Sequence, residues 1–368
     1  FPPEMAVPQL KAGAIMRWKC VTGERPRANV KPPTGGAGRL GVVFLAVSLL
    51  LSCSAPEAAD PDSNHLEISA APLALLSGQI ARDQEPPDLG ALTWLSGLEL
   101  RSPDPRFGGF SGLLLSPDGS TATAVSDHGH GVRFSLRHDE KGRLAGVDSA
   151  RIAPLLALDG QPFTDRFDRD AEALARLPDG SIAVAFEHNH RIWNYAGSSG
   201  DLTAVPTPMP FPSTTPAFGR NSGVEAMSEL SDGSILALVE GRAEDTQSPA
   251  YLWQGNRWHD LIYERDAGFR PTGATLLPDG DVLVVERFFT VLEGVKIRLV
   301  RLGAETLKPG ATLRGEVLAT LIPPVALDNM EGIAATRGIN GEIWVYLISD
   351  DNFSPLQRTL LLHFALKE

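Results

Sequence analysis

The feature that most constrains the fold is an internal repeat. Five segments share one plan: an apolar stretch, an Asp-Gly or Asn-Gly turn, a second apolar stretch and then an acidic residue. Such a turn between two β-rich runs predicts a hairpin, because its glycine readily adopts the positive φ that a tight turn needs. The five segments are 112–128, 173–188, 226–241, 274–287 and 332–351.

The spacing of the turns indicates a β-propeller. Asp118, Asp179, Asp232, Asp279 and Asn340 mark the turns, and successive turns are 47 to 61 residues apart. That spacing is the length of one four-stranded blade with its loops. The 316 residues after position 52 hold close to six such units. We therefore expect an all-β propeller of six four-stranded blades over residues 66–368, with the sixth blade built from residues 66–100 and a closing strand Thr359–Leu366.

Residues 1–52 are predicted to be an over-extended N-terminus and an export signal. The chain opens at Phe1, and Met16 is the better candidate initiator. Several basic residues precede an uncharged apolar run over residues 41–51, which is shorter than the roughly 20 residues that span a bilayer. The sequence Leu50-Leu51-Ser52-Cys53 resembles a bacterial lipobox; the alternative is an ordinary signal cut near Ser54-Ala55.

These signals predict the location of the mature protein. We expect lipidation at Cys53, a tether over residues 53–65, and a lipid-anchored or otherwise periplasmic monomer that contacts the membrane only through its anchor. Removal of Cys20 and acylation of Cys53 would leave no free thiol, which excludes thiol catalysis. The formal net charge of −12 argues against nucleic acid as a partner.

Polar residues recur at two places in each repeat. One row precedes the turn and the other follows the second strand, so both lie at the open end of an antiparallel hairpin. We expect the acids of these rows to ring one mouth of the central channel and to bind calcium, since crowded carboxylates need a cation and calcium prefers oxygen ligands. The alternative is that they clamp neighbouring blades through backbone amides. The candidate ligands are Glu172, Glu225, Glu331, Asp127, Glu187, Glu240 and Glu286.

Basic side chains follow the same acids. His128 and His130 form one His-x-His pair, and His188 and His190 form another. We predict that His188 or Glu187 acts as a general base. An anionic or ester substrate would be held by His128, His190, Arg242 and Arg287. Local salt bridges and a zinc site on the four histidines remain alternatives.

Two common catalytic motifs are missing from the sequence. No G-x-S-x-G elbow is present, so a serine α/β-hydrolase is not supported. The glycine-rich stretch at residues 107–112 lacks the Lys-Ser/Thr of a P-loop.

The ordered motifs resemble the phytase-like, or "esterase-like activity of phytase", family of exported bacterial proteins. They are FGGFSGLLLSPDG at 107–119, FDRDAEALARLPDGSIAVAFEHNHRIW at 167–193, NSGVEAMSEL with the following SDG at 221–233, RPTGATLLPDGDVLVVERFF at 270–289 and DNMEGIAA at 328–335. The resemblance covers roughly residues 90–366. It implies a β-propeller and a hydrolase of phosphoesters or carboxylic esters.

Three functions follow from these observations as hypotheses. The first is a calcium-dependent hydrolase at the channel mouth. The second is a propeller that binds a ligand or partner without turnover. The third is a calcium-dependent lactonase of the gluconolactonase type.

Overall fold

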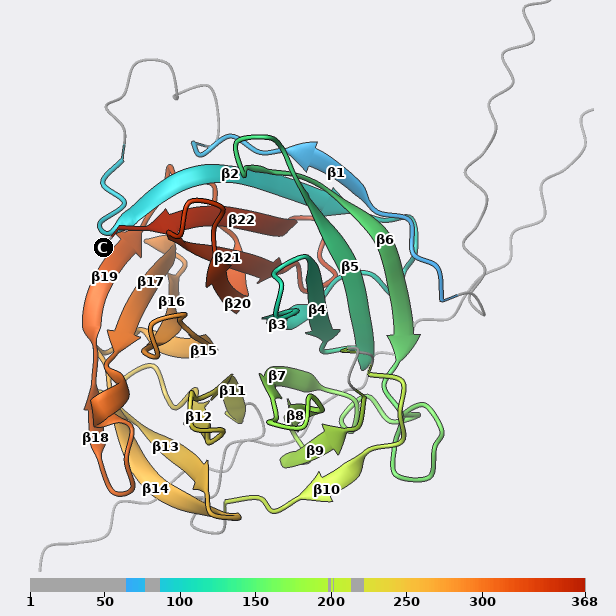
Figure 1. Ribbon diagram of the computed structural model, residues 1–368, viewed down its shortest axis with the longest axis vertical. Helices are drawn as coiled ribbons and strands as arrows, with labels where there is room; N and C mark the ends of the chain where they lie inside the picture. The colour runs from blue at the N-terminus through green and yellow to red at the C-terminus, as the bar shows by residue number, and fades with distance from the viewer. Residues whose placement is uncertain (1–63, 77–86, 198–199, 201, 213–221, 368) are drawn as a thin grey trace, which may run out of the picture. The chain divides into compact units, whose positions relative to one another are not determined.

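The computed structural model describes residues 64–76, 87–197, 200, 202–212 and 222–367 (Figure 1). The described residues all belong to one compact unit, which begins at Ser54. The predicted export signal and Cys53 lie outside the described residues. Within those residues, no helix is long and apolar enough to cross a membrane.

The described chain forms five β-sheets arranged as blades around a central axis (Figure 1). From the axis outward, blade 1 has β3 (Phe110–Leu115), β4 (Thr121–Ser126), β5 (His130–His138) and β6 (Leu144–Pro154). Blade 2 has β7 (Ala171–Arg176), β8 (Ile182–Phe186), β9 (Arg191–Tyr195) and β10 (Thr207–Met209).

The chain segment that forms blade 4 also contributes one strand to the outer edge of blade 3. Blade 3 has β11 (Val224–Glu229), β12 (Ile235–Val239), β13 (Gln247–Gln254), β14 (Arg257–Glu264) and the parallel strand β18 (Thr312–Arg314). Blade 4 has β15 (Arg270–Leu276), β16 (Val282–Thr290), β17 (Gly294–Leu302) and β19 (Glu316–Leu321). The short 3₁₀ helix η2 (Ala304–Thr306) and β18 lie between β17 and β19 in the chain.

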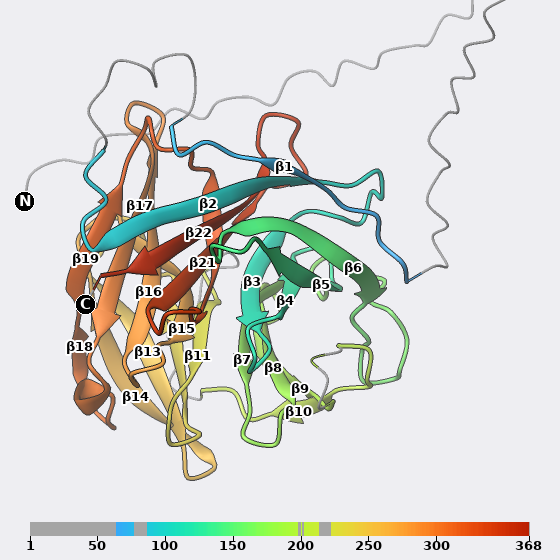
Figure 2. The same cartoon turned by 45° about the horizontal axis from the view of Figure 1, so that its top comes forward.

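Blade 5 joins the two ends of the described chain. Its inner strands are β20 (Asn329–Arg337), β21 (Ile343–Asp350) and β22 (Thr359–Leu366), and its outer strands are β2 (Leu92–Arg101) and β1 (Ser69–Pro72). Strand β2 pairs antiparallel with β22 from Leu92↔Leu366 to Leu100↔Thr359, and the two run side by side in both views (Figures 1 and 2).

The prediction of an all-β propeller is confirmed, and the predicted number of six blades is wrong. The segment before residue 101 and the strand Thr359–Leu366 do not make a separate blade, because both complete the blade of the fifth repeat. Dividing the chain length by the mean repeat length gave too many blades. Long loops and strand β18, which joins blade 3, use residues that do not form an additional blade.

The turn chemistry accounts for the five inner hairpins. Gly119, Gly180, Gly233, Gly280 and Gly341 all have positive φ, between 70° and 102°. In the first four turns the preceding Asp accepts a hydrogen bond from the backbone N–H two residues later, as from Ser120 to Asp118 at 3.1 Å. These local bonds stabilise the chain reversal before the strands pack.

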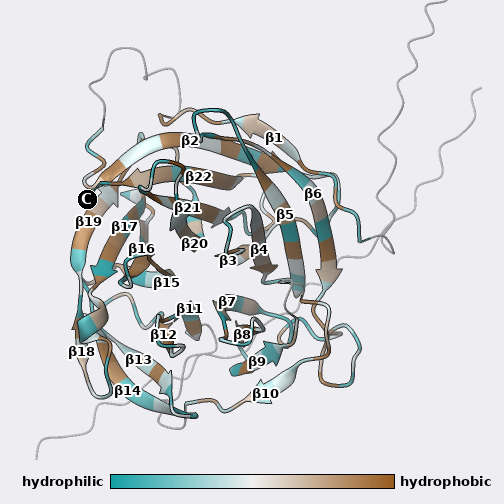
Figure 3. Ribbon diagram, in the orientation of Figure 1, coloured by the Kyte–Doolittle hydropathy of each residue, from teal (hydrophilic) through white to brown (hydrophobic). Residues whose placement is uncertain are grey.

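The second strand of each blade is largely apolar and buried on both faces, because each blade packs against two neighbours (Figure 3). In β16, Leu283 and Val285 join the apolar cluster shared with blade 5, while Val282 and Val284 join the cluster shared with blade 3. This two-residue alternation follows from strand geometry. Five such clusters fill the five interblade interfaces.

The first prediction concerns the pairing of β2 with β22, which closes the ring of blades. Leu98 of β2 is 1% exposed and packs between blades 5 and 1. We expect Leu98→Ala to lower the free energy of unfolding by about 2–5 kcal/mol, because it leaves a cavity at the seam. Thermal and denaturant unfolding would measure the loss. Leu292→Ala, at a residue 97% exposed, is the control and should change the free energy of unfolding by less than about 0.5 kcal/mol. If both substitutions lowered the free energy of unfolding equally, the packing of Leu98 between blades 5 and 1 would not be a special source of stability.

Candidate metal centre at the channel mouth

A β-bulge interrupts the inner hairpin of every blade at the same place. The register between the first two strands shifts once in each blade, and the extra residue belongs to the innermost strand. A bulge adds one unpaired residue and changes the direction of its side chain. The five extra residues are Ser111, Glu172, Glu225, Thr272 and Glu331. These five residues are the polar row that was predicted to precede the turn of each repeat.

Three of these residues, Ser111, Glu225 and Glu331, line a narrow pocket on the axis. Small residues of the inner strands also line it, among them Gly112 and Gly273. A Cβ on Gly273 would lie 2.4 Å from the carbonyl oxygen of Glu331, so only glycine allows this approach of the inner strands. Thr272 of blade 4 donates a hydrogen bond to the carbonyl of Met330 at 3.0 Å.

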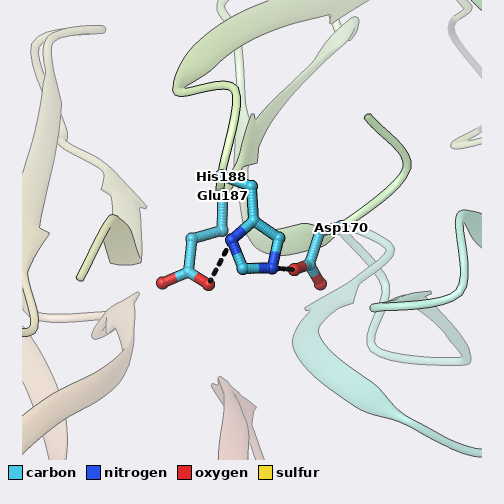
Figure 4. Close-up of side chains that lie close together, drawn as sticks. All are labelled: Asp170, Glu187 and His188. Atoms are coloured by element: carbon cyan, nitrogen blue, oxygen red, sulfur yellow. Dashed lines mark ion pairs between the residues drawn. The ribbon is translucent and has the colours of Figure 1, made fainter. Parts of the chain in front are cut away.

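Asp170, Glu187 and His188 form a group that can hold a metal ion (Figure 4). One ligand atom from each lies within 4.8 Å of the others. The Nε2 atom of His188 lies 3.0 Å from Asp170 Oδ2, and its Nδ1 atom lies 3.9 Å from Glu187 Oε2. His188 has a φ of 56°, an uncommon value for a residue with a side chain, and this turn directs the ring between the two carboxylates (Figure 4).

The carboxyl groups around this trio have pKa values above their ordinary range. Desolvation and the charges of Glu225, Asp170, Glu331 and Glu187 raise the pKa of Glu172 well above normal. Desolvation and neighbouring acids also raise the pKa of Glu225 well above normal and that of Glu187 to about 7. Glu172 is hydrogen-bonded to Asp170, and Glu225 to Glu187, so each pair shares a proton when no cation is present.

The acidic cluster continues to blades 1 and 5. Desolvation, with the charges of Asp170 and Glu331, raises the pKa of Asp127 to about 7. Desolvation and Glu331 raise the pKa of Asp350 to about 9. Asn329 donates hydrogen bonds to Glu331 at 2.8 Å and to Asp350 at 3.1 Å. The described acids therefore bring more negative charge to the mouth than they can hold ionised.

Two arginines of blade 4 offset part of this charge. Arg287 lies 3.3 Å from Glu331 and 3.4 Å from Glu240, and Arg270 lies 2.7 Å from Glu240. Burial alone would lower the pKa of Arg287, but Glu331, Glu240 and other acids raise it above its ordinary value. These pairs join blades 3, 4 and 5 through ion pairs between side chains, whereas the alternative drawn from the sequence was a clamp through backbone amides.

The loop between β21 and β22 covers the blade 5 side of the mouth. Asp351 accepts hydrogen bonds from the backbone of Gly109 at 3.0 Å and from Thr359 Oγ1 at 3.0 Å. Phe353 stacks on His128, with ring centroids 3.8 Å apart. This loop therefore fixes the position of His128 relative to Asp127.

Two predicted site residues, Glu286 and Arg242, lie away from the trio, whereas His190 lies close to it. Glu286 stays inside the β16–β17 ladder opposite Arg298, and it accepts a hydrogen bond from Tyr263 at 3.0 Å between blades 3 and 4. Arg242 is exposed.

The histidines of the two His-x-His pairs differ in their surroundings. His190 stacks near Phe211, with ring centroids 6.5 Å apart, and a Cβ on Gly223 would lie 3.1 Å from both His190 Nδ1 and Glu187 Cγ. Desolvation and the charges of Arg106 and Arg169 lower the pKa of His130 to about 4, so its ring is neutral at pH 7.

Asp170 is the candidate site residue that the sequence prediction missed. Its signal was present, because Asp170 and Glu172 are acids two residues apart on either side of Ala171 at the start of β7. Only Glu172 fits the repeat, since Asp170 has no acidic counterpart at the same place in blades 1, 3 and 4. Asn329 and Asp351 were overlooked in the same way.

Comparison with known proteins identifies one matching family profile. The profile described as "Phytase-like: Esterase-like activity of phytase" matches residues 105–353. No curated protein has significant sequence similarity to the chain.

Several solved structures are similar in fold. One, assigned as a gluconolactonase, has 11% identity and a TM-score of 0.40, with 82% of this chain and 94% of that chain covered. A gluconolactonase from Xanthomonas campestris has 9% identity and a TM-score of 0.38, covering 80% and 100%. A protein of unknown function from Dyadobacter fermentans has 13% identity and a TM-score of 0.35, covering 74% and 87%.

The raised pKa values predict how stability depends on pH. Asp127 and Glu187 keep protons in the folded protein up to about pH 7 and Asp350 up to about pH 9, whereas unfolded carboxyls lose theirs near pH 4. The folded state then binds more protons, so stability falls as pH rises from about 4 to 9. The expected slope is up to about 1.4 kcal/mol per pH unit for each such carboxyl.

Denaturant unfolding of chelator-treated protein from pH 5 to 9 would measure this slope. A bound divalent cation should flatten it, and Glu225→Gln should reduce it in the metal-free protein. Glu140→Gln, at an exposed residue, is the control and should leave the slope unchanged. Stability that rises with pH in the metal-free protein would contradict the prediction.

Proposed function

The chain belongs to the phytase-like family, and on that premise we propose that it is a metal-assisted hydrolase of ester bonds. The observation that supports this most directly is the trio of Asp170, Glu187 and His188 beside carboxyls with raised pKa values. Perturbed carboxyls next to a possible metal group at the mouth of a channel are typical of a catalytic site.

The donor set fits a divalent cation. Asp170 and Glu187 supply oxygens and His188 supplies a nitrogen, with Glu172 and Glu225 adjacent. We propose calcium, because carboxylate oxygens outnumber the single imidazole; manganese and zinc are the alternatives that the imidazole favours. When bound, the cation would polarise a carbonyl or phosphoryl oxygen and lower the pKa of a bound water.

Glu187 is the proposed general base. Burial and neighbouring acids raise its pKa to about 7 in the metal-free site. A carboxylate has two oxygens, so one can hold the cation while the other accepts a proton. In the proposed reaction, a water oxygen bonds to the carbonyl carbon or phosphorus, and the water proton passes to Glu187. The bond to the leaving oxygen then breaks, and the proton moves from Glu187 to that oxygen. The products are an acid and an alcohol.

His188 is proposed to hold the cation through Nδ1. Its Nε2 faces Asp170 at 3.0 Å, which favours a proton on Nε2 and leaves the lone pair of Nδ1, 3.9 Å from Glu187 Oε2, for the cation. The proposed substrate contacts are Arg287 and His128, which border the same cluster.

A binding propeller without turnover is the second candidate. The Arg270–Glu240 and Arg287–Glu331 pairs favour it, because they join blades and would stabilise a rigid binding face without chemistry. A lactonase falls within the hydrolase proposal, since a lactone is a cyclic carboxylic ester.

An envelope location is also part of the proposal, supported by the sequence around Cys53. We expect cells expressing the full chain to incorporate labelled palmitate into it, and expect Cys53→Ser to lose the label. Cys20→Ser is the matched control. Equal labelling of the two variants would exclude the lipobox.

Glu187→Gln tests the hydrolase. It keeps the size of the side chain and removes the base, so the kcat of calcium-loaded protein on phenyl esters and phosphoesters should fall by about 10²–10⁴-fold. Glu140→Gln is the control for an exposed acid and should keep full activity.

Glu225→Gln tests the metal through calorimetric titration with calcium, magnesium and zinc. Weaker binding together with slower ester cleavage would support the assignment. If both metal content and ester cleavage stay unchanged, Glu225 has no part in the site. If wild-type protein binds metal and cleaves no ester, the binding propeller is the better description.

A further inference from the structure

We propose that a pocket between blades 4 and 5 binds the apolar part of an uncharged carboxylic ester. This inference rests on the proposed function and narrows its substrate class. The pocket has a volume of about 510 Å³, within the range for small-molecule sites. We call it the Arg287 pocket, and its walls include Arg287, Phe289, Val295, Leu327, Asp328 and Asn329.

Strand alternation builds one wall of the Arg287 pocket. Arg287 and Phe289 are two residues apart on β16, so their side chains share a face, and Val295 of β17 is paired with Phe289. Leu327 and Asn329 form the opposite wall, where the chain enters β20. The wall is polar near the axis and becomes apolar toward the tip of the β16–β17 hairpin.

The polar end of the Arg287 pocket is part of the acidic cluster. Arg287 and Asn329 both line the pocket and both contact Glu331, at 3.3 and 2.8 Å. Arg287 also interacts electrostatically with Glu225, which is hydrogen-bonded to Glu187 of the trio. An ester group held at this end of the pocket would therefore lie on the side of the acidic cluster that leads to the possible metal group.

The charges of the pocket disfavour an anion. Arg287 is the one cation among the described residues that line the pocket, and it already faces Glu240 and Glu331. Asp328 adds a further carboxylate, which accepts hydrogen bonds from Gln357 and from the backbone of Arg358. The net negative charge of these side chains would repel a phosphate group. An ester carbonyl has no net charge and is not repelled.

The apolar end of the pocket is open to solvent. Phe289 is 61% exposed, although it is a large aromatic residue at the rim of a pocket. An acyl chain that lies against Phe289, Val295 and Leu327 would remove apolar surface from water, which stabilises the complex.

The p-nitrophenyl esters of acetate, butyrate and hexanoate test this proposal on calcium-loaded full-length protein. We expect kcat/KM to rise about fourfold for each buried methylene, and expect p-nitrophenyl phosphate to be cleaved more slowly than any of the three esters. Phe289→Ala should reduce the increase of kcat/KM with acyl-chain length. Val295→Trp should fill the pocket, so that the acetate ester becomes the best of the three substrates. Val291→Ala, at a neighbouring residue 91% exposed, is the control.

Binding of an uncleavable probe separates the pocket from the catalysis. N-phenylhexanamide should bind wild-type protein in a calorimeter, and Val295→Trp should weaken that binding at least tenfold while Val291→Ala does not. Binding without any ester cleavage would support the pocket and overturn the hydrolase. Ester cleavage that is independent of chain length, or a preference for the phosphate, would overturn the pocket and leave the hydrolase standing.

Discussion

Repulsion among carboxylates is the interaction on which the channel mouth depends. Bulges in blades 2, 3 and 5 direct Glu172, Glu225 and Glu331 toward one axis, and desolvation there raises the pKa of each. Only shared protons, arginines or a metal ion can balance the charge. The rigid blades maintain this concentration of charge because their interfaces are filled by apolar clusters. A flexible loop would separate the acids instead.

Two of the five bulges carry a hydroxyl side chain in place of a carboxyl, so negative charge is distributed unevenly around the mouth. Ser111 and Thr272 occupy the same positions in blades 1 and 4 without adding charge. The possible metal group therefore lies on blade 2, next to Glu225 of blade 3, while the arginines of blade 4 neutralise Glu240 and Glu331. The mouth thus has a possible metal group on one side and ion pairs between blades on the other.

The sequence predicted the repeat, the turns and the rows of polar residues, because each is set by a local pattern. It could not predict the fate of Glu286. In blades 1 to 3 the second strand ends just before Asp127, Glu187 and Glu240, whereas β16 continues to Thr290 and keeps Glu286 in its ladder. The left-handed turn at His188 and the completion of blade 5 by β2 were equally hidden, since both depend on tertiary contacts.

Closure of blade 5 has a consequence for biosynthesis. Strand β2 emerges from the ribosome early, yet its partner β22 consists of residues near the end of the chain. Until those residues are made, β2 has an unpaired edge and its apolar side chains have no partner, which invites aggregation. Contacts of such sequence separation also form slowly. The ring of blades therefore stays open until β22 has been made, and the late-made strand acts as the closure of a fold whose other blades are formed by neighbouring segments.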